Sequence, residues 1–271
     1  MQDKDCIRFL QWALPQIQMR LTGFRRVHKQ VCKRLARRLT ELELSDFDSY
    51  RQHLSSNHDE WQKLDSLCRV VVTRFYRDKR VFGELAERVL PQLAAAAQAA
   101  GREILHAWSI GSASGEEAYT LAILWYHLLA PRHPGLWLYT VGTEIDAHLL
   151  ERSHRTRYPG GAIKNLPEDL RNAAFVPGNG DYCLKPQYQT MVSFLRQDIR
   201  TELPDGEFDL ILGRNLVFTY FDEALQFATL ERIMTRLRPG GWLLLGVHES
   251  LPANTSGLKA VSERLGLYQY E

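Results

Sequence analysis

A glycine turn that ends in two acids restricts the chemistry of this 271-residue chain more than any other segment does. Residues 108–119 read Trp-Ser-Ile-Gly-Ser-Ala-Ser-Gly-Glu-Glu-Ala-Tyr, between an apolar run and a helical pattern of apolar residues. Gly111 and Gly115 permit positive φ and the close approach of a ligand, and the N–H groups of the new helix face that ligand. We expect such a turn to hold an adenosyl or nucleotide cofactor.

The two acids of this turn, Glu116 and Glu117, restrict the charge of the cofactor. They would repel a pyrophosphate at the place where a phosphate-binding loop needs neutral or positive groups. The turn therefore predicts a cationic cofactor and argues against NAD or ATP.

Further polar residues follow other short apolar runs, which we interpret as strands of one open α/β sheet. After the run that precedes the turn, the expected strands cover residues 136–141, 191–194, 208–212 and 242–246. Their ends bring Gly111, Glu144, Asp198 and Asn215 to one sheet edge, where open α/β sheets bind ligands. An acid at the tip of the second strand, Glu144, suits a ribose diol.

Helical periodicity and turn residues complete this sheet. Residues 225–237 predict a helix, and Arg238-Pro239-Gly240-Gly241 reads as its stop before the last buried strand. The tail 259–270 is short enough for an antiparallel strand pair. Residues 81–101 predict a helix packed on the sheet domain, whereas residues 1–75 predict a separate helical domain.

The helical domain contains a basic segment at residues 20–38. Val27, Val31, Leu35 and Leu39 recur every fourth residue and mark the buried face of one helix. The remaining surface carries Arg26, Lys29, Lys33, Arg34, Arg37 and Arg38, with almost no acid nearby. A solvated face is the common interpretation of such a run, but the missing acids favour a docking surface for an acidic protein helix. Without interleaved aromatic residues or a second basic element, nucleic acid is the weaker hypothesis.

Composition narrows the class of protein. The hydrophobic content is 45% and the net charge only +2, as expected for a globular protein that does not bind nucleic acid wholesale. No segment approaches a membrane span or a signal peptide, so we expect a cytoplasmic protein. The four cysteines lack paired spacing, so we expect buried thiols, with neither a zinc site nor a disulfide framework, and no metal.

Five motifs resemble the CheR-type chemotaxis receptor protein-glutamate O-methyltransferases, over nearly the whole chain from Leu21 to Tyr270. They are Thr-Arg-Phe-Tyr-Arg-Asp (73–78), Ser-Gly-Glu-Glu-Ala-Tyr (114–119), Thr-Glu-Ile-Asp (143–146), Arg-Asn with Tyr-Phe-Asp (214–222) and His-Glu-Ser (248–250). The resemblance implies a Rossmann-like S-adenosylmethionine-dependent methyltransferase sheet preceded by a small all-helical N-terminal domain. Its domains would be residues 1–75, a linker helix at 76–100 and a catalytic domain at 101–271, with a hairpin around 176–194 that grips a receptor tail in some members.

The resemblance also assigns roles to residues. It implies that Glu116 faces the methionine amino group, that Glu144 binds the ribose, and that Asp198 and Ile199 meet the adenine edge. Arg214 and Asn215 would lie beside the methyl-transfer point, and Thr73 and Arg77 would come from a segment that folds over the cofactor. We expect Arg77 to orient the incoming carboxylate and Tyr220 to shape the transfer site. The basic helix would meet the acidic helical cytoplasmic region of a receptor, and the protein would act as a monomer without entering the membrane.

Some residues depart from the family pattern. Val71 stands where the family has Asn, Asp198-Ile199 replaces Asn-Leu, and the segment 214–221 is one residue longer, which shifts Tyr220. These departures leave two alternatives open, a small-molecule methyltransferase and a cofactor-binding regulatory protein without turnover. Retention of Arg77, Glu116 and Asn215 argues against the second alternative, and the basic helix argues against the first.

Overall fold

The computed structural model describes residues 3–253 and 255–271, which form two compact units. The helical unit comprises the chain up to Val72 together with Thr219–Gln226, and the sheet unit comprises Thr73–Phe218 and Phe227–Glu271. The sequence gives no sign that residues 219–226, so distant along the chain, belong with the N-terminal helices.

The helical unit packs its helices around an apolar core. Its elements are α1 (Asp3–Gln16), the 3-10 turn η1 (Leu21–Phe24), α2 (His28–Glu41), α3 (Phe47–Ser56) and α4 (His58–Cys68). Helix α2 begins later than the expected helix, because η1 precedes it. Val31, Leu35 and Leu39 are buried as predicted, whereas Val27 lies just before the helix and is only half-buried.

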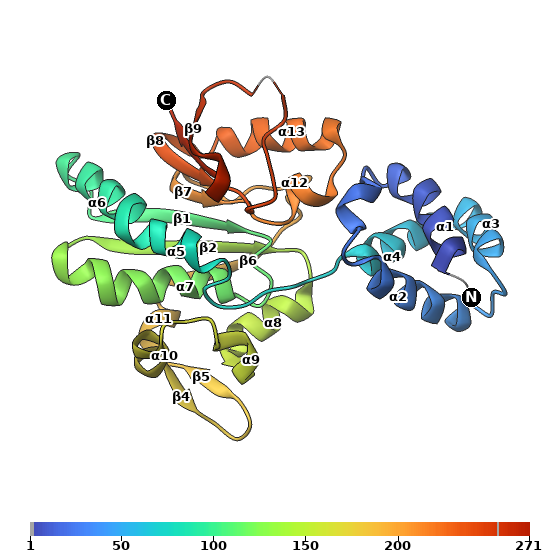
Figure 1. Cartoon of the computed structure of the whole chain (residues 1–271), viewed down its shortest axis with the longest axis horizontal. Helices are drawn as coiled ribbons and strands as arrows, with labels where there is room; N and C mark the ends of the chain where they lie inside the picture. The colour runs from blue at the N-terminus through green and yellow to red at the C-terminus, as the bar shows by residue number, and fades with distance from the viewer. Residues whose placement is uncertain (1–2, 254) are drawn as a thin grey trace. The chain divides into compact units, whose positions relative to one another are not determined.

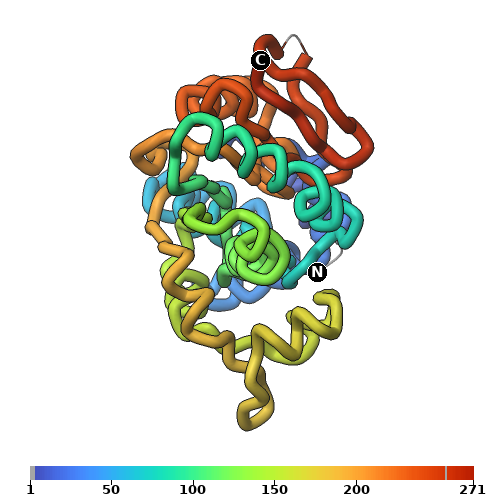
Figure 2. The backbone as a smooth tube through the Cα atoms, turned by 90° about the vertical axis from the view of Figure 1, so that its left-hand side faces the viewer, coloured from blue at the N-terminus to red at the C-terminus, as the bar shows by residue number. Residues whose placement is uncertain are grey.

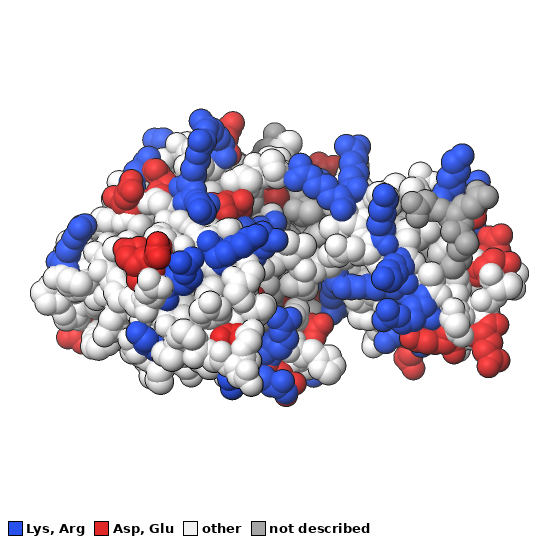
Figure 3. Space-filling view, turned by 60° about the horizontal axis from the view of Figure 1, so that its bottom comes forward, with Lys and Arg blue, Asp and Glu red and all other residues white. Residues whose placement is uncertain are grey.

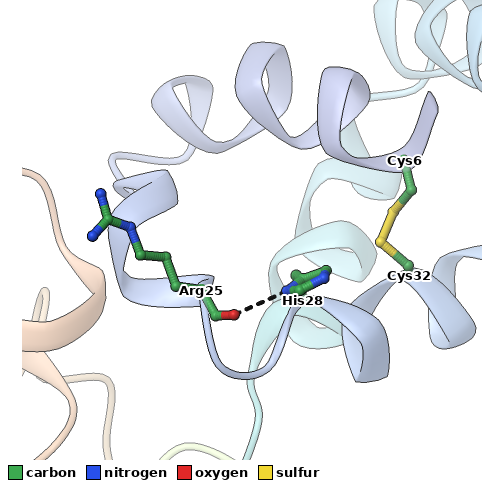
Figure 4. Close-up of a disulfide and its surroundings, with 4 residues drawn as sticks. All are labelled: Cys6, Arg25, His28 and Cys32. Carbon is green, nitrogen blue, oxygen red and sulfur yellow. Dashed lines mark hydrogen bonds between the residues drawn. A yellow bond between two sulfur atoms is a disulfide. The ribbon is translucent and has the colours of Figure 1, made fainter. Parts of the chain in front are cut away.

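A disulfide joins α1 to α2, so the prediction of buried thiols is wrong for this pair of cysteines. Cys6 and Cys32 are bonded, with their Cα atoms 5.9 Å apart (Figure 4). Their separation of 26 residues carries no signal in the sequence, because only the packing of the two helices brings them together. Near Cys32, His28 Nδ1 donates to the backbone oxygen of Arg25 at 3.0 Å (Figure 4). Cys68 and Cys183 carry free thiols, and burial raises the pKa of Cys68 to about 12.

A mixed sheet forms the centre of the sheet unit (Figure 1). Its strands are β1 (Ile104–Ile110), β2 (Trp137–Glu144), β6 (Val192–Arg196), β7 (Phe208–Leu212), β8 (Leu237–Leu244), β9 (Leu258–Ser262) and β10 (Leu267–Tyr270). Within the described residues the strand order is β6-β2-β1-β7-β8-β10-β9. The first five strands in this order pair in parallel, and β10 is antiparallel to β8 and β9. The predicted Rossmann-like sheet and its antiparallel tail are confirmed.

Helices cover the sheet unevenly. The helices and helical turns are α5 (Lys79–Glu84), the π turn η2 (Leu85–Val89), α6 (Leu90–Ala99), α7 (Glu116–Leu124), η3 (Trp125–Leu129), η4 (Ala130–Arg132), α8 (Ala147–Arg155), α12 (Val217–Tyr220), α13 (Glu223–Met234) and η5 (Glu263–Leu265). Helices α6 and α7 pack against β1, and α7 and α8 pack against β2 and β6. The connection from β6 to β7 contains no helix in the described residues. On one face of the neighbouring strands β2 and β6, the side chains of Trp137, Tyr139 and Leu195 are exposed.

The prediction of a helix stop before the last parallel strand is wrong, because strand β8 begins before these residues. The expected helix stop, Pro239-Gly240-Gly241, lies inside β8, and α13 ends earlier, at Met234. Gly240 has φ +77°, and the register of β7 against β8 shifts between Phe208 and Leu210. The glycines therefore form an irregularity within a strand rather than a turn before one.

A second, small sheet lies in the same unit. It pairs β3 (Arg157–Tyr158), β5 (Tyr182–Leu184) and β4 (Phe175–Pro177), with the short helices α9 (Gly160–Ile163), α10 (Glu168–Ala174) and α11 (Pro186–Gln189). The β4–β5 hairpin, expected around 176–194, projects away from the large sheet in both views (Figures 1 and 2). Its strands are shorter than the expected range because α11 and β6 follow β5 directly.

Candidate cofactor site at the strand tips

The glycine turn between β1 and α7 is crowded as well as bent. Gly111 has φ +63° and Gly115 φ +89°, a region that glycine adopts without a steric penalty. A Cβ on Gly111 would lie 2.7 Å from the side chain of Leu216, and one on Gly115 would lie 2.8 Å from the ring of Phe194. Both positions therefore require glycine.

Glu116 begins α7 with its carboxylate buried. The residue is only 1% exposed, and its two oxygens accept from Ser114 Oγ at 3.0 Å and from Thr73 Oγ1 at 3.2 Å. Burial raises the pKa of Glu116 above its usual value. The direct partners of this buried anion are hydroxyls, and the charge of Arg152 offsets only part of the cost of burial, so the site favours a ligand that brings a positive charge.

Glu144 ends β2 and holds the turn in place. Its Oε2 accepts from the backbone N–H of Ala113 at 3.0 Å, and its Oε1 accepts from those of Ile145 and Asp146 at 2.9 and 3.1 Å. Burial again raises the pKa of this carboxyl group. These three bonds leave one acceptor site of the carboxylate, on Oε2, which suits a ribose hydroxyl.

Asp198 and Ile199 follow β6, as expected, but the carboxylate of Asp198 is paired. Arg200 Nη2 donates to Asp198 Oδ2 at 2.7 Å, and Arg200 Nε donates to both oxygens at 3.0 Å. The charge of the acid is therefore balanced within the loop. Ile199 is buried, and its backbone oxygen accepts from Arg232 Nη1 at 3.1 Å.

The segment 73–78 carries Thr73 and Arg77 to these strand tips. Its Phe75 packs edge-on against Tyr158 and Phe175, with ring centroids 4.7 and 5.1 Å away. Arg77 Nη2 donates to Asn215 Oδ1 at 3.3 Å. The structure thus brings together, within the sheet unit, the predicted residues Thr73, Arg77, Glu116 and Asn215.

Arg214 ties this segment to the sheet, a role the sequence did not indicate. Its side chain is only 2% exposed; Nη1 donates to Glu117 Oε2 at 2.9 Å, and Nη2 pairs with Asp78. Glu117 also accepts from Ser109 Oγ at 2.8 Å. Because its charged partners are Glu117 and Asp78, Arg214 acts as a support for the segment. Glu117 likewise serves this pair and not the glycine turn.

Two other predicted residues lie in the helical unit. Tyr220 packs on Phe24 with ring centroids 5.0 Å apart, and its backbone oxygen accepts from Arg20 N at 2.8 Å. Val71 is exposed near the end of this unit.

The basic surface on the helical unit is narrower than predicted. Arg34 Nη1 donates to the backbone oxygens of Leu67 and Arg69, and Arg38 binds Glu60 through two nitrogens. These two side chains hold the helices together. The others, Arg26, Lys29, Lys33 and Arg37, are exposed and form what we call the basic stripe. Figure 3 shows Lys and Arg side chains gathered on this face of the helical unit.

The described residues contain neither a cluster of metal-ligating side chains nor a membrane-spanning helix. In the described part of the chain, His, Cys, Asp and Glu nowhere gather in threes in a way that could hold a metal ion. Every helix built from residues 3–253 and 255–271 is too short or too polar to cross a lipid bilayer.

The chain is similar to known methyltransferases over most of its length. The family model described as "CheR methyltransferase, SAM binding domain" matches residues 71–266. A chemotaxis protein methyltransferase of Listeria innocua is 26% identical over 92% of this chain and 91% of its own length. One of Escherichia coli is 30% identical over 82% of this chain and 77% of its own length. An uncharacterised 104.1 kDa protein of Rhodobacter capsulatus is 31% identical over 88% of this chain but only 25% of its own length.

Proposed function

Because the chain belongs to the CheR methyltransferase family, we propose that it transfers methyl groups from S-adenosylmethionine to glutamate side chains of a chemotaxis-type receptor. The products would be glutamate methyl esters and S-adenosylhomocysteine. The observation that carries this proposal is the buried carboxylate of Glu116 at the glycine turn, beside the segment that bears Arg77. A cationic methyl donor fits such a site, whereas a phosphate-bearing cofactor does not.

The residues at the strand tips suit the different groups of this cofactor. Glu116 would receive the ammonium group, with Ser114 and Thr73 holding the carboxylate in position. Glu144 would accept from a ribose hydroxyl through Oε2. The adenine would lie at Asp198 and Ile199, where the balanced charge of the Asp198–Arg200 pair lets the acid accept from the adenine amino group without a net anion in the pocket.

Methyl transfer to a carboxylate requires little proton transfer by the protein. When bound, the cofactor supplies an electrophilic methyl group on a sulfonium. An acceptor glutamate, with an ordinary pKa of about 4.3, is already ionised at neutral pH and is the nucleophile. Arg77, held by Asn215 Oδ1, would orient the carboxylate of this acceptor. Such positioning can supply roughly 7 to 11 kcal/mol of the barrier reduction.

The basic stripe supplies a docking surface for the acceptor. Its four cations are exposed on one unit, and the cytoplasmic helical bundle of a receptor would present acids to them. We propose that the protein acts in the cytoplasm, as a monomer that meets a receptor without entering the membrane.

The test is methyl transfer from radiolabelled S-adenosylmethionine to the purified cytoplasmic fragment of a chemotaxis receptor. We expect label that is released as methanol by mild base, because carboxyl methyl esters hydrolyse there and N-methyl groups do not. Replacing the labelled glutamates by glutamine in the receptor should abolish transfer. Base-stable label, or transfer to small acids in preference to the receptor, would favour a small-molecule methyltransferase instead.

A further inference from the structure

Glu249 lies in the turn after β8, and its carboxylate holds the tip of the neighbouring strand. Its Oε2 accepts from the backbone N–H of Asn215 at 2.7 Å and from that of Gly246 at 2.7 Å. The residue is 8% exposed, so these charge-assisted bonds form away from water. Strands β7 and β8 are paired up to Leu212 and Leu244, which brings the two tips side by side.

The backbone that Glu249 binds is in an unusual conformation. Asn215 has φ +58°, in the left-handed region that costs a non-glycine residue roughly 1 kcal/mol, although Asn tolerates it better than most. In this conformation its side-chain Oδ1 accepts from Arg77 Nη2 at 3.3 Å. The orientation of the Arg77–Asn215 pair thus depends on what holds the backbone of Asn215.

Gly246 provides the space for this arrangement. A Cβ at this position would lie 2.7 Å from Glu249 Oε2 and 2.9 Å from Asn215 Oδ1. The carboxylate of Glu249 and the amide of Asn215 therefore both pack against the bare backbone of Gly246. Any larger residue would displace one of the two.

We propose that Glu249 is a positioning residue for the methyl-transfer end of the cofactor site, acting through Asn215 on Arg77. In this role it acts through the backbone of Asn215 rather than on the reacting groups. This inference rests on the proposed function and on the expectation that Asn215 lies beside the methyl-transfer point, next to the methionine part of the cofactor.

Ligand binding by the full chain tests the proposal. S-adenosylhomocysteine carries the methionine part, and methylthioadenosine lacks its amino and carboxylate groups. Losing a charge-assisted bond to the strand tip should weaken S-adenosylhomocysteine binding roughly tenfold or more in Glu249→Leu, and Gly246→Ala should do the same. Methylthioadenosine should bind both variants within about twofold of the wild type, which a general folding defect would not allow.

Two further variants separate positioning from folding. Glu249→Gln keeps an oxygen that can accept from both N–H groups, so it should restore most of the affinity for S-adenosylhomocysteine. In a double-mutant cycle, adding Glu249→Leu to Asn215→Ala should cost little more than Asn215→Ala alone. Additive losses, or Glu249→Leu binding like the wild type while Asn215→Ala is weak, would overturn the inference. A wild-type protein that binds neither ligand would instead refute the proposed function.

Discussion

At the scale of single residues, burial sets the behaviour of the two acids at the glycine turn. The pKa values of both Glu116 and Glu144 are raised because each carboxyl group is taken out of water. Hydroxyls from Ser114 and Thr73 and backbone N–H groups hold these carboxylates in place without supplying a full positive charge. A cationic ligand would therefore be the strongest partner available to Glu116.

We predict that the affinity for S-adenosylmethionine falls as the pH drops toward the raised pKa of Glu116. Below that pKa the carboxyl group is neutral and cannot pair with an ammonium group, so binding must first release a proton. Calorimetry in buffers of different ionisation enthalpy measures this proton release directly. Glu116→Gln should bind more weakly and lose most of the pH dependence, leaving only the part due to Glu144. An unchanged pH profile in Glu116→Gln would contradict this role.

At the scale of elements, the segment 73–78 is held at several points. Phe75 is packed between two aromatic rings, Tyr76 N donates to Thr120 Oγ1 at 3.1 Å, and Asp78 pairs with Arg214. Of these attachments of the segment that would cover the cofactor, the ion pair of Asp78 with Arg214 is the charged one.

We predict that Arg214→Met leaves Glu117 and Asp78 without their cation and destabilises the sheet unit by about 3 kcal/mol, because one half of a buried ion pair is lost. Trypsin should then cut more rapidly after Arg74 and Arg77. The matched control is Arg102→Met, which removes the nearer of two cations at buried Asp209, at 2.7 Å, and leaves Arg238 at 3.8 Å. The control should lower stability in urea without exposing the segment; equal cleavage in both variants would refute the fastening role.

The second prediction at this scale concerns the contribution of the disulfide between α1 and α2 to stability. It closes a loop of 26 residues, so reduction should lower the stability of the helical unit by about 3 kcal/mol. Thermal unfolding with and without dithiothreitol, compared with Cys6→Ser/Cys32→Ser, measures this loss. Cofactor binding should be unchanged, because the site lies in the sheet unit. In a reducing compartment the pair would be two thiols, and no change in unfolding would show that the bond is not formed.

The sequence predicted most of the sheet and less of the site's supports. Strands such as β7 are short runs that are apolar apart from single residues such as Asp209, and the glycine turn is local, so both are visible in the sequence. Arg214 and Glu117 pair across 97 residues, and Glu249 reaches Asn215 across 34. No local pattern encodes such contacts. The His-Glu-Ser motif marked Glu249 only through resemblance to a family, without a role.

At the scale of the whole molecule, the exposed cations proposed for docking and the residues proposed for cofactor binding lie in different units. The helical unit carries the basic stripe, while the predicted cofactor-binding residues belong to the sheet unit. Two of the six predicted basic residues, Arg34 and Arg38, are bound inside the helical unit, so their mutation would test stability more than docking.

We predict that Lys33→Glu with Arg37→Glu raises the KM for a receptor fragment roughly tenfold or more, with kcat and cofactor affinity nearly unchanged. Reversing exposed charges slows an electrostatically guided encounter, and added salt should narrow the gap between variant and wild type. The control reverses two exposed cations of the sheet unit, Arg132→Glu with Lys259→Glu. Methylation rates over a range of receptor concentrations measure both. A stripe variant that behaves like the control would rule out docking there.

The proposed function depends most on cofactor binding at the strand tips. Calorimetric titration with S-adenosylmethionine and S-adenosylhomocysteine, repeated on Glu116→Gln and Glu144→Ala, tests it most directly. We expect the wild type to bind both ligands and each variant to bind them at least roughly tenfold more weakly, since each loses a buried charged contact. Absence of binding by the wild type, or variants that bind as tightly as the wild type, would contradict the account.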